Sequence, residues 1–67
     1  MSFGTNIKKF RESQALSQNE LANKINVTQP TVAMWETGVA MPRADKLPEL
    51  AKILKCDVSD LFEKEHE

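Results

Sequence analysis

The hydrophobic residues of this 67-residue chain recur every three or four positions along its length, which is the period of one face of an α-helix. They predict helices over residues 3–14, 18–25, 29–37 and 45–55 and a short fifth helix over 58–62, with no strand pattern and no internal repeat. The sequence therefore predicts one all-α domain. The apolar stripes consist of Phe3, Ile7 and Phe10; Leu21, Ala22 and Ile25; Val32 and Trp35; Leu47, Leu50, Ala51 and Leu54; and Val58, Leu61 and Phe62.

The ends of the second and third helices are marked by residues that start and stop helices. Ser17 is followed three residues later by Glu20, a capping-box pattern in which each side chain accepts a hydrogen bond from a backbone N–H of the other residue. Asn26 tolerates the left-handed conformation that ends a helix, Thr28 can cap the next helix, and Gly38 can end it. Because only two residues separate the two helices, they are expected to cross steeply, as in a helix-turn-helix.

Two prolines and an acidic end fix the remaining boundaries. Pro30 falls in the first turn of the third helix, where its missing N–H costs nothing. Asp45 is the expected cap of the fourth helix, because a start there places Pro48 in the first turn. We expect residues 64–67 to form a frayed acidic tail, which leaves residues 1–63 as the folded domain.

Composition excludes several classes of protein. The single cysteine, Cys56, cannot form an internal disulfide, as is usual in a reducing cytoplasm. No signal peptide or membrane-spanning apolar run occurs in the sequence, so we expect a cytoplasmic protein with no membrane partner. The single histidine, His66, has no metal-ligand spacing to Cys56, and two glycines do not make a phosphate-binding loop. We therefore expect no catalytic residue, no metal, no cofactor and no small-molecule ligand.

Charge is distributed unevenly along the chain, although the net charge is only −1. Residues 1–46 hold six basic and four acidic residues, a net of +2, whereas residues 47–67 hold three basic and six acidic residues, a net of −3. The asymmetry fits an N-terminal part that faces an anion and an acidic end. Random scatter of surface charge is the simpler explanation.

The residues around the predicted turn carry a specific resemblance. Residues 18–37, QNELANKINVTQPTVAMWET, resemble the helix-turn-helix of the phage-repressor and Cro-type (XRE-like) family of DNA-binding proteins. The resemblance extends through IKKFRE, WETG and PRADKLPELA to cover about residues 3–62. It implies a compact five-helix, lambda-repressor-like domain with the helix-turn-helix at the second and third helices. Asn26 departs from the glycine usual in the family, and an unrelated helical bundle is the competing interpretation.

The third helix has an inner and an outer side. At about 100° per residue, Val32 and Trp35 define the side that faces the core. Gln29 is the best candidate for reading a base, because an amide can accept a hydrogen bond from adenine N6 and donate one to N7; a solvated amide is the alternative. The predicted base-reading residues are Gln29, Pro30, Thr31, Ala33 and Met34.

The apolar groups in this set limit what the third helix can read. Pro30, Ala33 and Met34 can pack on a thymine methyl but cannot make directional hydrogen bonds, so we expect a preference for T-containing steps and few direct contacts. Met34 also fits a simply exposed methionine or a protein-binding surface. Thr31 fits a contact to either a phosphate or a thymine methyl.

Phosphate contacts are expected mainly at the start of the second helix. Its unpaired N–H groups and the positive end of its dipole suit a phosphate oxygen, and ordinary capping without a ligand is the alternative. The resemblance implies that Gln18 clamps a phosphate and that Arg43 lies near the DNA backbone or minor groove, although a plain surface arginine also fits Arg43. Thr28 also fits a cap alone. The predicted phosphate-contacting residues are Ser17, Gln18, Asn19, Thr28, Thr37 and Arg43.

Glu36 needs a partner. It lies about 40° from Val32 around the helix, on the core side, where an unpaired carboxylate would cost several kcal/mol. Arg11, one residue beyond Phe10, is the natural partner, and the resemblance implies such an Arg–Glu ion pair between the first and third helices. We interpret this pair as structural.

The leading hypothesis is a sequence-specific transcriptional regulator of double-stranded DNA, expected to be a repressor. One module offers few readable contacts, so we expect a homodimer on a near-palindromic operator. Either Val58, Leu61 and Phe62 or the stretch after Gly38 could supply the dimer surface, although core packing also accounts for these apolar residues. The alternative is a protein-interaction module such as an antitoxin or adaptor, which the apolar outer side of the third helix and the net charge of −1 favour.

Overall fold

The computed structural model describes residues 2–63, which form five α-helices and one short 3-10 turn and contain no strand. The predicted all-α fold is confirmed. The predicted acidic tail, residues 64–67, lies outside the described residues. The elements are α1 (Ser2–Ser13), α2 (Gln18–Ile25), α3 (Gln29–Thr37), η1 (Ala44–Lys46), α4 (Leu47–Leu54) and α5 (Val58–Leu61).

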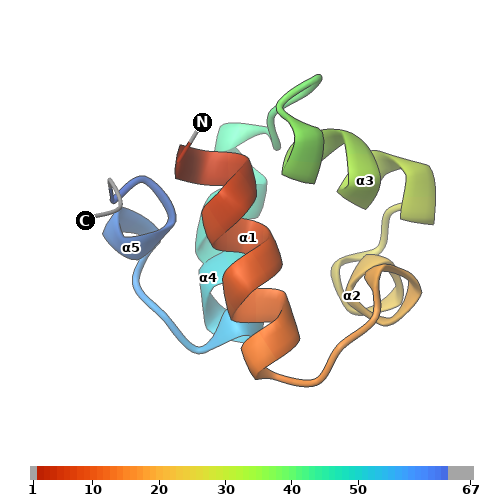
Figure 1. The fold of residues 1–67 in the computed structure, drawn as a ribbon, viewed down its shortest axis with the longest axis horizontal. Helices are drawn as coiled ribbons and strands as arrows, with labels where there is room; N and C mark the ends of the chain where they lie inside the picture. Colours follow the sequence, from red (N-terminus) through yellow and green to blue (C-terminus); the bar gives the residue numbers. More distant parts are fainter. Residues whose placement is uncertain (1, 64–67) are drawn as a thin grey trace.

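Helix α1 lies in the middle of the fold, with α2 and α3 on one side, α5 on the other and α4 behind it (Figure 1). α3 packs against both α1 and α2, and α4 packs against α1, α2 and α5. α2 is seen nearly end-on in Figure 1 while α3 runs across the view, so the two helices cross steeply, as predicted. This arrangement places α3 at the edge of the molecule.

The core is built from the predicted apolar stripes. Val32 is fully buried and Trp35 nearly so, which confirms that these residues define the inner side of α3. The fifth helix ends earlier than predicted, at Leu61. Phe62 is 45% exposed, and its ring centroid lies 4.9 Å from that of Phe3. The other large side chains that are fully buried are Ile7, Leu21, Ile25, Leu50, Leu54 and Leu61.

Asn6 accounts for the end of α5. The Nδ2 of this buried residue donates to the backbone carbonyls of Asp60, Leu61 and Glu63 at 3.3, 3.1 and 2.7 Å. The last carbonyls of a helix have no partner within the helix. Asn6 therefore satisfies these groups and holds the turn after α5 against α1.

The predicted start and stop signals around α2 are confirmed. The N–H of Ser17 donates to Glu20 Oε1 at 2.7 Å, and the N–H of Glu20 donates to Ser17 Oγ at 3.0 Å. Asn26 ends α2 with φ of 65°, and Gly38 ends α3 with φ of 85°. Asparagine thus adopts the left-handed conformation at the turn between α2 and α3.

Thr28 precedes α3, as predicted, but its hydroxyl does not cap the helix. Thr28 Oγ1 lies 3.0 Å from Thr31 Oγ1 and, within residues 2–63, accepts no hydrogen bond from a backbone N–H. A capping oxygen binds the N–H of the second or third helical residue. The second is Pro30, which has no N–H, and the N–H of Thr31 donates to the Thr28 carbonyl at 3.1 Å.

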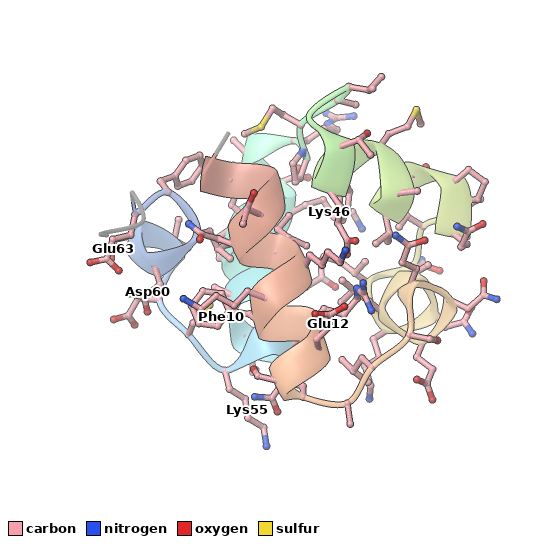
Figure 2. The ribbon with its side chains drawn as sticks, in the orientation of Figure 1. Phe10, Glu12, Lys46, Lys55, Asp60 and Glu63 are labelled. Carbon is pink, nitrogen blue, oxygen red and sulfur yellow. The ribbon has the colours of Figure 1, made fainter. Side chains whose placement is uncertain are left out.

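The prediction that Asp45 caps the fourth helix is wrong. Residues Ala44–Lys46 form η1, and α4 begins directly after it with Pro48 in the first turn, as predicted. Asp45 therefore lies inside the 3-10 turn, too early to reach the first N–H groups of α4. Lys46, labelled in Figure 2, donates from Nζ to the Ile25 carbonyl at 2.9 Å and so ties the start of α4 to the end of α2.

Gly4 allows α1 to approach the end of α3 closely. A Cβ at this position would lie 2.8 Å from the Trp35 carbonyl oxygen and would overlap the Glu36 carbonyl oxygen as well. These atoms belong to the backbone, so they cannot move aside as a flexible side chain can. The absence of a side chain at Gly4 therefore permits the close contact between α1 and the end of α3.

Candidate nucleic-acid interface

The outer side of α3 is accessible, as its periodicity predicted. Val32 and Trp35 are buried, whereas Met34 on the opposite side is 39% exposed. None of the predicted base-reading residues is sealed in the core. Pro30 and Met34 are exposed, and Gln29, Thr31 and Ala33 are half-buried.

Two glutamine side chains meet where α2 and α3 begin. Gln29 Nε2 donates to Gln18 Oε1 at 2.8 Å, and Gln18 Nε2 donates to Glu36 Oε1 at 3.0 Å. A glutamine amide has two N–H groups and an acceptor oxygen. The bond to Gln18 uses one N–H of Gln29, which leaves the other N–H and the carbonyl oxygen for a further partner.

The predicted ion pair between Arg11 and Glu36 is present. Arg11 Nε donates to Glu36 Oε2 at 2.6 Å and Arg11 Nη2 donates to Glu36 Oε1 at 3.2 Å, while Nη1 donates to the Leu16 carbonyl at 2.7 Å. The side chains are only 10% and 5% exposed, respectively. The hydrogen bond to Glu36 raises the pKa of Arg11 above its ordinary value. This guanidinium therefore joins α1, the loop before α2 and α3.

The ion pair and the two amides form one chain of hydrogen bonds. Arg11 and Gln18 both donate to Glu36, and Gln29 donates to Gln18. Groups held in this way lose little freedom when a ligand arrives. The buried pair thus holds the Gln29 amide in position at the exposed start of α3.

The start of α2 carries three of the predicted phosphate-contacting residues. Ser17 and Asn19 are exposed and Gln18 is half-buried. The N–H groups of Gln18 and Asn19 belong to the first turn, where the helix supplies no acceptor. Hydrogen bonds from the backbone N–H and side chain of Ser17 lower the pKa of Glu20, so this carboxylate stays charged and partly offsets the positive end of the helix.

Thr37 and Arg43 are not brought together with that group. Thr37 is exposed at the far end of α3, where its hydroxyl donates to the Met34 carbonyl at 3.3 Å. Arg43 follows the loop after α3 and approaches Asp45 at 3.9 Å, both side chains being largely exposed. Because α3 rises about 1.5 Å per residue, the two groups of predicted phosphate contacts stand at opposite ends of the helix.

The surface around α3 is nearly neutral and partly apolar. Glu36 is the only charged residue of the sequence between positions 26 and 42, and Arg11 neutralises it internally. Beyond Gly38, Val39 is 74% exposed and Met41 is 52% exposed. The polar groups that this surface offers are therefore mainly helix ends and hydroxyl groups.

Sequence reasoning missed the contact between Gln18 and Gln29. Both residues are the first of their helices, but Gln18 lies at the end of α2 that is far from the turn. The contact depends on the steep crossing of the two helices, which no neighbouring residue indicates. Sequence reasoning also missed Lys46, whose bond to α2 joins residues 21 positions apart. That bond leaves no local signal in the sequence.

The described residues hold no group of three or more His, Cys, Asp and Glu side chains that could bind a metal. Burial, with Asp60 and Asp57 nearby, raises the pKa of the half-buried Cys56 thiol. His66 lies outside the described residues. Among residues 2–63, the helices are too short and too polar to cross a membrane.

Comparisons with known proteins agree with this geometry. A family model described as helix-turn-helix matches residues 7–61. An uncharacterised helix-turn-helix transcriptional regulator of Archaeoglobus fulgidus is 31% identical over 58 residues, which are 87% of this chain and 83% of that protein. Several further regulators that match are longer, and the chain spans between 32% and 54% of their lengths.

Two solved structures have the same fold. The P22 c2 repressor in complex with a synthetic operator matches with a TM-score of 0.86 at 24% identity, over 91% of this chain and 92% of that one. SinR, the master regulator for biofilm formation, was solved in complex with DNA. It matches with a TM-score of 0.82 at 26% identity, over 91% of this chain and 98% of that one.

The fold and the α2–α3 geometry define a five-helix, lambda-repressor-like helix-turn-helix domain. The chain belongs to the helix-turn-helix family of the phage-repressor and Cro type, as its sequence resemblance implied. The relatives named above are described as helix-turn-helix transcriptional regulators.

Proposed function

We propose that this protein is a cytoplasmic repressor that binds double-stranded DNA sequence-specifically, as a homodimer on a near-palindromic operator, with α3 in the major groove. The observation that carries the proposal is the Gln29 amide, held by Gln18 and the buried ion pair at the exposed start of α3. The operator complex of the P22 c2 repressor and the DNA complex of SinR support the same use of the fold.

Gln29 reads adenine in this proposal. Its free N–H and carbonyl oxygen match N7 and the N6 amino group of adenine, a bidentate contact worth about 1–3 kcal/mol of discrimination. Pro30, Ala33 and Met34 add apolar contact with thymine methyl groups. Thr31 contacts either a thymine methyl or a phosphate.

The two groups of phosphate contacts hold the duplex on either side of α3. Ser17, Gln18 and Asn19 bind one strand's backbone near the start of α3 through first-turn N–H groups. Thr37 and Arg43 bind the backbone near its far end. Thr28, whose hydroxyl does not cap α3, is available for a further contact.

The proposed dimer uses an apolar patch after α3, which we define as Val39 and Met41. A two-fold interface needs the same patch on both protomers, and these exposed side chains lie at the end of α3. Across the two-fold axis, Arg43 of one protomer can pair with the partner's Asp45, since the pair within one chain is only at 3.9 Å. The alternative surface is poor, because Leu61 is fully buried.

The test is DNA binding at low salt, followed by a salt titration. Labelled genomic fragments should be selected by the wild type and by Lys52→Ala, an exposed control on α4, and bound less tightly by Gln29→Ala. Arg43 is the one basic residue among the proposed phosphate contacts, so the two Arg43 side chains of a dimer predict a shallow log–log salt slope of about −2. Failure to select any fragment would count against the proposal.

A protein-interaction module, such as an antitoxin or adaptor, is the second candidate. The neutral surroundings of α3 and the apolar patch favour it. Val39→Asp separates the two functions: in the repressor it weakens cooperative binding to a full operator but spares half-site binding. If DNA binding is absent and this substitution abolishes capture of a partner protein, the interaction module is the better assignment.

A further inference from the structure

A groove lies away from α3, between the loop after α1, α2 and the end of α4. Its volume is about 460 Å³, and α3 contributes none of the residues that line it. None of the residues proposed to contact DNA lines the groove, although Leu16 directly precedes Ser17. The lining residues are Gln14, Leu16, Lys24, Ile53 and Lys55.

The groove combines an apolar floor with a positive rim. Leu16 and Ile53 are half-buried, whereas Lys24 and Lys55 are exposed. Neither lysine forms an ion pair with another residue of the 2–63 range, and the Glu20 carboxylate, one turn before Lys24, is held by the Ser17 N–H instead. Such a groove suits an acidic segment that carries one apolar side chain.

Lys55 occupies a position where the backbone itself disfavours a side chain. It ends α4 with φ of 59°, in the left-handed region that glycine or asparagine adopts more easily. Figure 2 shows its side chain extending away from the fold at the lower edge of the molecule. The ammonium group is thus free of the fold, beside the groove that Lys55 helps to line.

A surface of opposite charge, which also has an exposed apolar side chain, lies at the end of α5 of the same chain. Phe62 is 45% exposed and stands between Asp60 and Glu63. The Asp60 and Glu63 side chains lie together on the outer side of α5, well away from Lys55 (Figure 2). Asn6 pins the backbone of this acidic turn, which we define as residues 60–63, by three hydrogen bonds.

We propose that the acidic turn of one copy docks in the groove of a second copy. Phe62 would pack on the apolar floor, and the Glu63 carboxylate would face one rim lysine. Asp60, whose Oδ2 accepts a hydrogen bond from the Asp57 N–H at 2.9 Å, would face the other lysine through Oδ1. Because groove and turn are different parts of the chain, the contact is head-to-tail and leaves one of each free for further copies. So small an interface is weak in solution and gains strength where DNA holds neighbouring copies side by side.

The test is self-association of the full chain without DNA, so that its outcome is independent of the proposed DNA binding. Sedimentation velocity from micromolar to millimolar concentration should show assembly at low salt that is lost at high salt. Lys24→Glu and Glu63→Lys should each abolish it, whereas the double variant should restore it by exchanging the charges. Mixing the two single variants should likewise restore association. Lys52→Glu, the same change outside the groove, should leave it unchanged.

Further variants separate this contact from the two-fold dimer. Val39→Asp, in the apolar patch, should retain the head-to-tail association. Thermal melts by circular dichroism establish that each variant is folded. A chain that stays monomeric at every concentration at low salt, single variants that assemble like the wild type, or a folded double variant that does not regain assembly would overturn the proposal.

Discussion

Glu36 is the residue on which the exposed start of α3 depends. It is nearly buried, and it accepts hydrogen bonds from Arg11 and from Gln18, which in turn accepts one from Gln29. A carboxylate in this position is tolerated because Arg11 compensates its charge. At the scale of single residues, stability and the proposed base reading therefore share one set of hydrogen bonds.

Arg11→Ala tests this residue-scale argument. Removing one partner leaves a buried carboxylate uncompensated, and we expect a loss of about 3 kcal/mol, which lowers Tm by roughly 12–24 °C in a domain of this size. Lys8→Ala, exposed on the same helix, should change stability by no more than about 0.5 kcal/mol. Thermal melts of both variants provide the measurement. An unchanged Tm for Arg11→Ala would show that the ion pair with Glu36 does not stabilise the fold.

At the scale of elements, the sequence predicts those structural features that depend on residues close together in the chain. The capping box at Ser17 and the helix ends at Asn26 and Gly38 are local, and the structure has them as expected. The Arg11–Glu36 pair could also be predicted from the sequence, because a charged residue on the buried side of a helix needs a partner of opposite charge. The accessible side of α3 followed from its period, although its contacts with DNA remain predictions.

Contacts between distant segments could not be predicted in this way. Asn6 satisfies the end of α5 from 54 to 57 positions away, so nothing beside it in the sequence indicates that role. Asp45 was wrongly predicted to cap α4 because aspartate is common both at helix caps and in short 3-10 turns, and the sequence does not distinguish the two positions. Thr28 failed to cap for a reason that was visible in the sequence, the proline two positions later.

Gly4→Ala tests how α1 is packed against α3. In an ordinary helix interior this substitution stabilises a protein by about 0.5–1 kcal/mol, but here the new Cβ would overlap backbone carbonyls of α3. We expect a loss of about 1–3 kcal/mol, measured as a lower urea midpoint. Thr5→Ala, exposed on the same helix, is the control. A raised midpoint for Gly4→Ala would contradict the close approach.

The cap of α2 gives stability a specific dependence on pH. Hydrogen bonds from Ser17 lower the pKa of Glu20 below its ordinary value of 4.5, so the folded state favours the charged form. This contribution is present above pH 4.5 and is lost as pH falls through the lowered pKa. The Tm difference between the wild type and Glu20→Gln should therefore be positive at pH 7 and should shrink as the pH falls through the lowered pKa. Melts across this range would contradict the cap if the difference stayed constant.

At the scale of the whole molecule, three surfaces of the fold carry three separate proposals. The start of α3 and the start of α2 face DNA, the apolar patch after α3 faces a two-fold partner, and the groove and acidic turn link copies head-to-tail. The uneven distribution of charge along the chain fits this arrangement of surfaces. The acidic excess falls beyond residue 46 in the sequence, and Asp60 and Glu63 of this part form the acidic turn.

The most direct test of the central claim is selection of bound duplexes from a random DNA pool, by the wild type and by Gln29→Ala in parallel. We expect a two-fold symmetric site for the wild type, with half-sites about 10 base pairs apart. Each half-site should contain an adenine that Gln29→Ala no longer selects, while the remaining positions persist. A pool without enrichment, or identical sites for both proteins, would contradict the claim that Gln29 reads a base from the exposed start of α3.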